Sequence, residues 1–162
     1  MSFASMLAGL VSSRLRFVVV GGVAGTMHGA ERVTNDLDVV YDANDPETIN
    51  ALARLLASWG GYPRGVERGL PFIMDARTLR AAPILTLSTS EGDLDVLDAI
   101  DGVGDYAAVV KHSELVDAFG IEFRILDLPT LIRSKRATGR PKDREAILEL
   151  EVLRDALKKK RK

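Results

Sequence analysis

The chain has 162 residues, 46% of them apolar, and it contains no cysteine. This length and composition predict one globular domain with a buried core over residues 1–162, and they exclude a disordered chain. The lack of cysteine excludes a disulfide-stapled secreted scaffold. We expect neither a signal peptide nor a membrane span, because no apolar run approaches the ~20 residues that a span needs. We therefore expect a cytoplasmic protein.

The net charge of −1 conceals an asymmetry along the chain. Residues 1–127 carry 10 Lys and Arg against 18 Asp and Glu, whereas residues 128–162 carry 12 against 5. An acidic body beside a basic segment is typical of a metal-binding face next to a phosphate-binding one. The alternative is a solvated helix pair with a lysine-rich tail.

The first sixty residues predict helices and strands in alternation. A strand of β-branched and aromatic residues ends at Gly21-Gly22. A helix begins at Asp45-Pro46, with Asp45 as its cap, and it ends at Gly60-Gly61. The expected elements are a helix over 2–13, a strand over 16–20, a helix over 23–30, a strand over 35–41 and a helix over 45–60.

The rest of the chain predicts a less regular order. Residues 61–82 read as irregular or short-stranded because glycine and proline recur there. Further on we expect strands over 84–89 and 93–97, a helical turn over 106–111, a hairpin of 114–119 with 122–126, and helices beginning at Pro129 and Pro141. Because this order is not a simple alternation, we predict an α+β (mixed α/β) fold with a mixed central sheet. Its parts are a core over residues 16–127, a helical segment over 128–157 and a basic tail over 158–162.

Acidic residues alternate with apolar ones in two of the predicted strands. Residues two apart on a strand share a face, so Asp36 and Asp38 point the same way while Leu37 packs inward. The strand at 93–97 repeats the pattern, and Asp95 or Asp93 joins the pair if the two strands are neighbours. Such a strand can also be merely an exposed polar face.

Three converging carboxylates need a cation. Each pair at ~5 Å repels by roughly 3 kcal/mol at an effective dielectric constant near 20, so three ionised groups cost roughly 10 kcal/mol. Protonation, a basic side chain or a metal ion relieves this repulsion. Ligation by oxygen alone favours Mg²⁺ or Mn²⁺.

Two common phosphate-binding motifs are excluded. The glycines at 21, 22, 25 and 29 fit neither G-x-G-x-x-G nor a P-loop. Instead, Val20-Gly21-Gly22, a spacer of thirteen residues and then Asp36-Leu37-Asp38-Val39 resemble the defining motif of the nucleotidyltransferase superfamily. The string from Gly21 to Val40 resembles the small bacterial branch near the AbiEii-type toxins. Leu128-Pro129 before Lys135, and Gly139-Arg140-Pro141-Lys142-Asp143, resemble later motifs of that branch.

The resemblance implies a nucleotidyltransferase fold and a role for each matching residue. Asp36, Asp38 and Asp95 would be catalytic and hold Mg²⁺ or Mn²⁺, with Asp95 preferred to Asp93 and acting as the base on the attacking hydroxyl. The expected nucleotide-binding residues are Gly21, Gly22, Arg32, Thr34, Lys135 and Asp143, with Asp143 orienting Lys135. Gly22 replaces a serine often found in relatives, so the chain lacks that hydroxyl.

Each of the less certain positions also has a plain structural explanation. His28 fits a packed histidine as well as it fits the nucleotide site. Arg32 could be a surface arginine or a partner of Glu31, and Lys135 could merely neutralise a helix end.

The resemblance implies an enzyme that moves a nucleoside monophosphate from an NTP to an acceptor hydroxyl on RNA such as a tRNA end, on a protein or on a small molecule. A toxin–antitoxin role with a cognate partner protein also follows from the branch. The alternatives are a non-catalytic or antitoxin-like partner-binding module of the same fold, and a metal-dependent phosphohydrolase, which the Gly-Gly motif disfavours.

Overall fold

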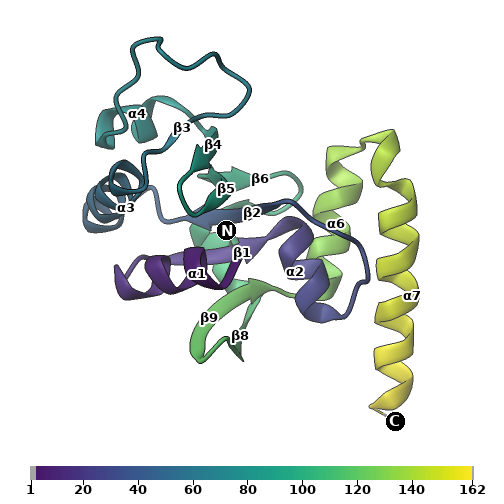
Figure 1. Ribbon diagram of the computed structural model, residues 1–162. Coiled ribbons are helices and arrows are strands. Elements are labelled where there is room, and N and C mark those ends of the chain that lie inside the picture. The colour runs from purple at the N-terminus through teal and green to yellow at the C-terminus, as the bar shows by residue number, and fades with distance from the viewer. Residues whose placement is uncertain (1–2, 162) are drawn as a thin grey trace.

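A mixed seven-stranded sheet forms the centre of the computed structural model, which describes residues 3–161 (Figure 1). The strand order is β3-β4-β5-β2-β1-β9-β8. The bounds are β1 (Phe17–Val20), β2 (Asp36–Tyr41), β3 (Tyr62–Pro63), β4 (Ile84–Thr89), β5 (Gly92–Leu97), β8 (Ser113–Ala118) and β9 (Ile121–Leu126). Two short strands, β6 (Ala99–Ile100) and β7 (Gly104–Asp105), pair as a separate hairpin.

The sheet combines both kinds of strand pairing. β2 lies parallel to β5 and β1 parallel to β9, whereas β1 and β2, β3 and β4, β4 and β5, and β8 and β9 are antiparallel. The mixed sheet confirms the expected fold class. The strands at 35–41, 84–89 and 93–97 and the hairpin at 114–126 are also confirmed, each within one or two residues.

Helices pack around this sheet, and a pair of helices lies to one side of it. α1 and α3 are neighbours at the left in Figure 1, and α6 and α7 form a pair beyond α2 on the opposite side. The bounds are α1 (Phe3–Ser12), α2 (Gly21–His28), α3 (Pro46–Ser58), α4 (Ala76–Ala81), α5 (Tyr106–Lys111), α6 (Leu128–Thr138) and α7 (Arg144–Lys160). Within residues 3–161 we find no helix with the length and apolar character to cross a membrane.

The pleat of β2 and β5 separates their apolar and acidic side chains. Leu37 and Val39 are fully buried, and so is Leu94, which pairs with Leu37 across the two strands. Gly92 lies against Met6 of α1, so these apolar positions face α1. The aspartates occupy the alternate positions and therefore point away from α1.

The helix expected over 23–30 begins two residues earlier than predicted. The Gly21–Gly22 pair is the first turn of α2 rather than a turn before it. Gly21 has φ +66°, a value that residues with a Cβ rarely adopt, and this lets the chain pass from strand to helix without a loop.

Other differences involve short elements. Residues 61–82 contain the two-residue strand β3 and the helix α4, which Asp75 caps by accepting from the Thr78 N–H. The β6–β7 hairpin was not expected at all. Pro141 begins a 3₁₀ turn (Pro141–Asp143), and α7 starts only at Arg144.

The cap expected at Asp45 differs in its partner. The Asp45 carboxylate accepts a hydrogen bond of 2.8 Å from the Thr48 hydroxyl, and the structure shows no bond from it to a backbone N–H of α3. Arg16 lies 3.7 Å from the same carboxylate, so Asp45 ties the start of α3 to the residue before β1.

Candidate active site

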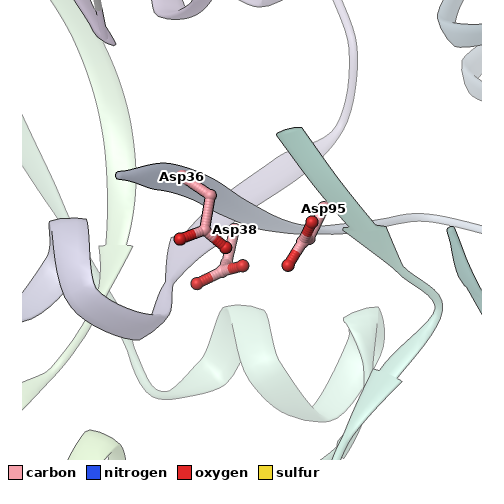
Figure 2. A group of neighbouring side chains, drawn as sticks. All are labelled: Asp36, Asp38 and Asp95. Atoms are coloured by element: carbon pink, nitrogen blue, oxygen red, sulfur yellow. The ribbon is translucent and has the colours of Figure 1, made fainter. Parts of the chain in front are cut away.

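The register of β2 and β5 brings three carboxylates together. Asp38 lies opposite Asp95, and Asp36 opposite Asp93. One oxygen each from Asp36, Asp38 and Asp95 lies within 4.8 Å of the other two, and Figure 2 shows the three side chains gathered in one place. Asp93 is not part of this group. Of the two candidates on the second strand, Asp95 is therefore the one that the fold places with the pair.

Crowding and burial perturb two of these groups. The pKa of Asp38 rises to about 8, first because burial disfavours its charge, and then because of the hydrogen bond with Asp95 and the charges of Asp36 and Asp95. Lys135 opposes this rise. Burial and then Asp95 also raise the pKa of Asp36, and Arg64 opposes that rise. The metal-free site therefore holds a proton near neutral pH.

Arg64 is a part of the site that no sequence motif predicts. Its Nη2 lies 2.5 Å from Asp95 Oδ1 and 3.8 Å from Asp36 Oδ2, and its Nη1 donates to the Leu87 carbonyl at 3.0 Å. The only signal in the sequence is a basic residue within the irregular stretch of an acidic body. No motif spacing relates it to the aspartates, because the contact depends on how β3 joins the edge of the sheet.

A cavity of about 450 Å³ separates the carboxylates from α6. Asp38 and Asp95 line it from the sheet, and Lys135 and Arg140 line it from the C-terminal segment. The α6 residues in its wall are spaced as one helix face: Leu131, Ser134, Lys135 and Thr138. The β6–β7 hairpin closes another side, where Asp101 accepts from the Thr138 hydroxyl at 3.2 Å. The cavity is thus acidic on one wall and basic on the opposite one.

Gly21 has no room for a side chain. An added Cβ would lie 2.1 Å from Asp38 Oδ2, in addition to the strain of φ +66°. The glycine therefore lets the backbone at the start of α2 come directly against the carboxylate.

Gly22 also has little room for a side chain, because Thr34 lies close to it. An added Cβ would lie 2.7 Å from Thr34 Oγ1, and that hydroxyl donates to the Asp36 carbonyl at 3.2 Å. Gly22 itself supplies no hydroxyl. In the structure, the Thr34 hydroxyl lies beside this position.

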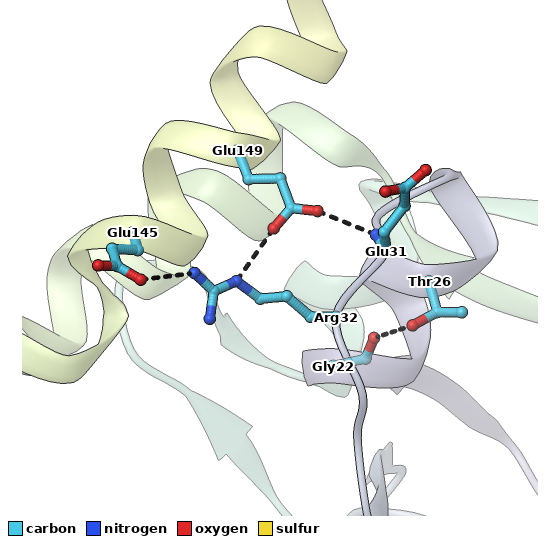
Figure 3. Close-up of polar contacts among 6 residues, drawn as sticks. All are labelled: Gly22, Thr26, Glu31, Arg32, Glu145 and Glu149. Atoms are coloured by element: carbon cyan, nitrogen blue, oxygen red, sulfur yellow. Dashed lines mark hydrogen bonds and ion pairs between the residues drawn. The ribbon is translucent and has the colours of Figure 1, made fainter.

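Arg32 lies in a contact with α7 rather than with the carboxylates. It pairs with Glu149 at 3.0 Å and with Glu145 at 3.4 Å, while Glu149 also accepts from the Glu31 N–H (Figure 3). The partners found for it in the described chain are thus glutamates of α7, and not the Glu31 side chain that was one of the structural alternatives. Arg32 is not among the residues that line the cavity, and its role in nucleotide binding stays a prediction.

Asp143 pairs with Arg140 at 3.1 Å rather than with Lys135. It therefore orients a different cation of the cavity wall from the one expected. The His28 side chain is only 8% exposed, and its Nε2 lies 2.8 Å from the Leu126 carbonyl, which matches the packed histidine of the two alternatives.

The donor set fits a hard divalent cation. Three carboxylates supply only oxygen, and their close oxygens can surround one ion with small side-chain movements. A bound cation would also reverse the rise in the pKa of Asp38, because it favours the ionised form.

Comparison with known proteins identifies the fold. The sequence matches no protein-family model and no curated protein. Several solved structures, including these three, are similar to the chain. The first is a candidate nucleotidyltransferase from Thermotoga maritima, with a TM-score of 0.54, 14% identity, and coverage of 97% of this chain and 93% of that one. The second is an antigenic nucleotidyltransferase-like protein from Paracoccidioides brasiliensis. Its TM-score is 0.56 and its identity 18%, and the match covers 93% of this chain and 72% of that one.

The third similar structure is the antibiotic-resistance factor ANT(2'')-Ia, with a TM-score of 0.55, 16% identity, and coverage of 97% of this chain and 91% of that one. All three likenesses extend over nearly the whole chain. The chain therefore has the nucleotidyltransferase fold, as the sequence predicts.

The raised pKa of Asp38 predicts how stability depends on pH. The folded protein keeps a proton on Asp38 that the unfolded chain has lost, so the free energy of unfolding falls as pH rises from about 4 through about 8. Without metal, we expect a fall of roughly 2 kcal/mol between about pH 5.5 and 7.5. Asp38→Asn should remove most of it in denaturant titrations. Asp93→Asn, outside the three-carboxylate group, should keep it; an equal slope in all three proteins would contradict the assignment.

The contact of Gly21 with Asp38 can be separated from its backbone strain. Gly60 has φ +64° with nothing within 4 Å of an added Cβ, so Gly60→Ala measures the strain alone. We expect Gly60→Ala to cost roughly 1 kcal/mol and Gly21→Ala at least about 2 kcal/mol more, because its methyl group displaces Asp38. Denaturant unfolding of both variants checks this. Equal losses would show that Gly21 is needed only for its backbone conformation.

Proposed function

We propose that this protein transfers a nucleoside monophosphate from an NTP to an acceptor hydroxyl. The observation that supports this most strongly is the cavity that carries carboxylates on one wall and Lys135 with Arg140 on the other. A triphosphate with its metal ion needs both: oxygen ligands for the cation and positive groups for the phosphates. The nucleotidyltransferase fold and the Gly-Gly and Asp-x-Asp motifs agree with it.

Asp36, Asp38 and Asp95 would hold Mg²⁺ or Mn²⁺. When bound, such an ion neutralises phosphate charge and positions the triphosphate for in-line attack. Asp95 would take the proton of the acceptor hydroxyl as its oxygen attacks the α-phosphorus. A new phosphorus–oxygen bond then forms to the acceptor, the bond to the bridging oxygen breaks, and pyrophosphate leaves.

The chain's other groups would bind the phosphates. Lys135 faces the carboxylates from α6, and its charge already acts on Asp38. The backbone of Gly21 and Gly22 forms the first turn of α2, where N–H groups at a helix N-terminus favour an anion. Gly21 contacts Asp38, so a phosphate there would lie beside the metal.

The acceptor and the biological setting are open to test. An RNA or tRNA end, a protein side chain and a small molecule all present a suitable hydroxyl. A toxin–antitoxin role with a partner protein follows from the resemblance to AbiEii-type toxins, a branch that the three similar structures do not include. The intact set of carboxylates favours an enzyme over a partner-binding module of the same fold.

A labelling experiment tests the proposal. The protein is incubated with Mg²⁺ and each α-labelled NTP, with total RNA, with a protein extract or with small hydroxyl compounds. We expect label on one acceptor class, and its loss in Asp95→Asn but not in Asp93→Asn. Nucleotide binding without transfer to any class would instead favour the partner-binding alternative.

Lys135 gives a direct test of the basic wall. We expect Lys135→Ala to weaken the binding of a non-hydrolysable NTP with Mn²⁺ by 1.5–3 kcal/mol, or roughly 10- to 150-fold, because it removes a charge-assisted contact. Calorimetry measures this. Arg136→Ala is the matched control, since Arg136 is the next residue of α6 but pairs with Glu151. If both variants bind as tightly as the parent, the basic wall has no part in nucleotide binding.

A further inference from the structure

We propose that Arg64 is a built-in counterion of the three-carboxylate group, and that a divalent cation must displace its guanidinium to bind there. This inference rests on the metal site of the proposed function. It assigns a residue that neither the motifs nor the comparisons identify. Arg64 would then set how tightly the site binds metal.

The guanidinium occupies the space that a metal ion would need. Its Nη2 lies between two of the three carboxylates, 2.5 Å from Asp95 Oδ1 and 3.8 Å from Asp36 Oδ2. A Mg²⁺ ion binds carboxylate oxygens at 2.0–2.1 Å. The ion and the guanidinium nitrogen therefore compete for the same oxygen lone pairs, and their positive charges repel at that distance.

The fold holds the backbone of Arg64 and leaves its side chain able to move. The Arg64 N–H continues the pairing of β3 with β4 by donating to the Thr86 carbonyl at 2.9 Å. Thr86 pairs with Asp95 on β5, and Asp95 pairs with Asp38 on β2, so the four residues lie in one row across the sheet. The side chain reaches along this row.

The Arg64 side chain can leave the carboxylates by moving toward solvent. The Arg64 side chain is 29% exposed, and apart from its ion pairs with Asp95 and Asp36 it donates one hydrogen bond from Nη1 to the Leu87 carbonyl among the described residues. The side chain can therefore rotate toward water without a change in the sheet. Arg64 also accounts for how the metal-free protein keeps its carboxylates together, since its guanidinium lies close to both Asp95 and Asp36.

Arg68 offers a matched control on the same segment. Its guanidinium lies over the Tyr62 ring, 5.3 Å from the ring centre, and no contact with the carboxylates is found for it in the described chain. Arg64→Gln and Arg68→Gln each remove one positive charge from the same stretch. Only the first removes a charge that competes with metal.

The test measures binding of Mg²⁺ alone by calorimetry, at about pH 9 so that protons do not take the place of the missing guanidinium. We expect Arg64→Gln to bind Mg²⁺ roughly tenfold more tightly than the parent, and Arg68→Gln to bind like the parent. Without metal, Arg64→Gln should melt at a lower temperature than the parent, and saturating Mg²⁺ should close that gap. Equal or weaker Mg²⁺ binding in Arg64→Gln would overturn the inference.

The outcomes separate this inference from the proposed function. If the parent binds Mg²⁺ and Arg64→Gln binds it no better, only the role of Arg64 is wrong. If neither binds Mg²⁺, the metal site and the inference both fail. If Arg64→Gln does not fold, an NMR titration of the parent protein with Mg²⁺ gives the answer. The Nε–H signal of Arg64 should then change, whereas the Nε–H signal of Arg68 should remain unchanged. No change at Arg64 on saturation would overturn the inference.

Discussion

The repulsion among three carboxylates is the constraint on which the site depends. It arises because the hydrophobic core dictates the register of β2 and β5. Leu37 pairs with Leu94 and Val39 with Val96, and all four are buried on the α1 side of the sheet. Slipping the register by one residue would expose this apolar set. The pleat therefore forces the alternate positions, which carry acids, together on the other side. The hydrophobic core thus stabilises an arrangement of three carboxylates that is opposed by their mutual repulsion.

Several parts of the fold reduce that repulsion, and they come from different directions. Arg64 reaches the carboxylates from the β3 edge, and Lys135 approaches them from α6. A proton on Asp38 removes one charge near neutral pH. Each of these is reversible, because a side chain can rotate and a proton can leave. The carboxylates are thus held together by charges that a stronger cation can replace.

The sequence predicts the strands and the acidic group well because both follow from local patterns. Alternation at Asp36–Val39 and at Asp93–Val96 indicates strand and face directly. Periodicity says less about which strands are neighbours, so it cannot choose between Asp93 and Asp95. The family resemblance favoured Asp95, and the strand register places Asp95 with Asp36 and Asp38. Arg64, the close approach of Thr34 to Gly22 and the true contacts of Arg32 were not predictable. They depend on how a short edge strand, a loop and a distant helix pack, and such contacts leave no spacing in the chain.

The position of the basic wall follows from packing between α2 and the C-terminal segment. Leu131 of α6 and Leu150 of α7 lie close to Gly25 of α2, and Leu153 of α7 lies close to Gly29. At the rim of this contact, Arg32 from the acidic body pairs with the two glutamates of α7 (Figure 3). The segment's own acids are thereby partly neutralised by the body. Lys135 is left facing the carboxylates instead of Glu145 or Glu149. The charge asymmetry seen along the sequence thus becomes an asymmetry across one cavity, because the apolar contacts fix which cations face which acids.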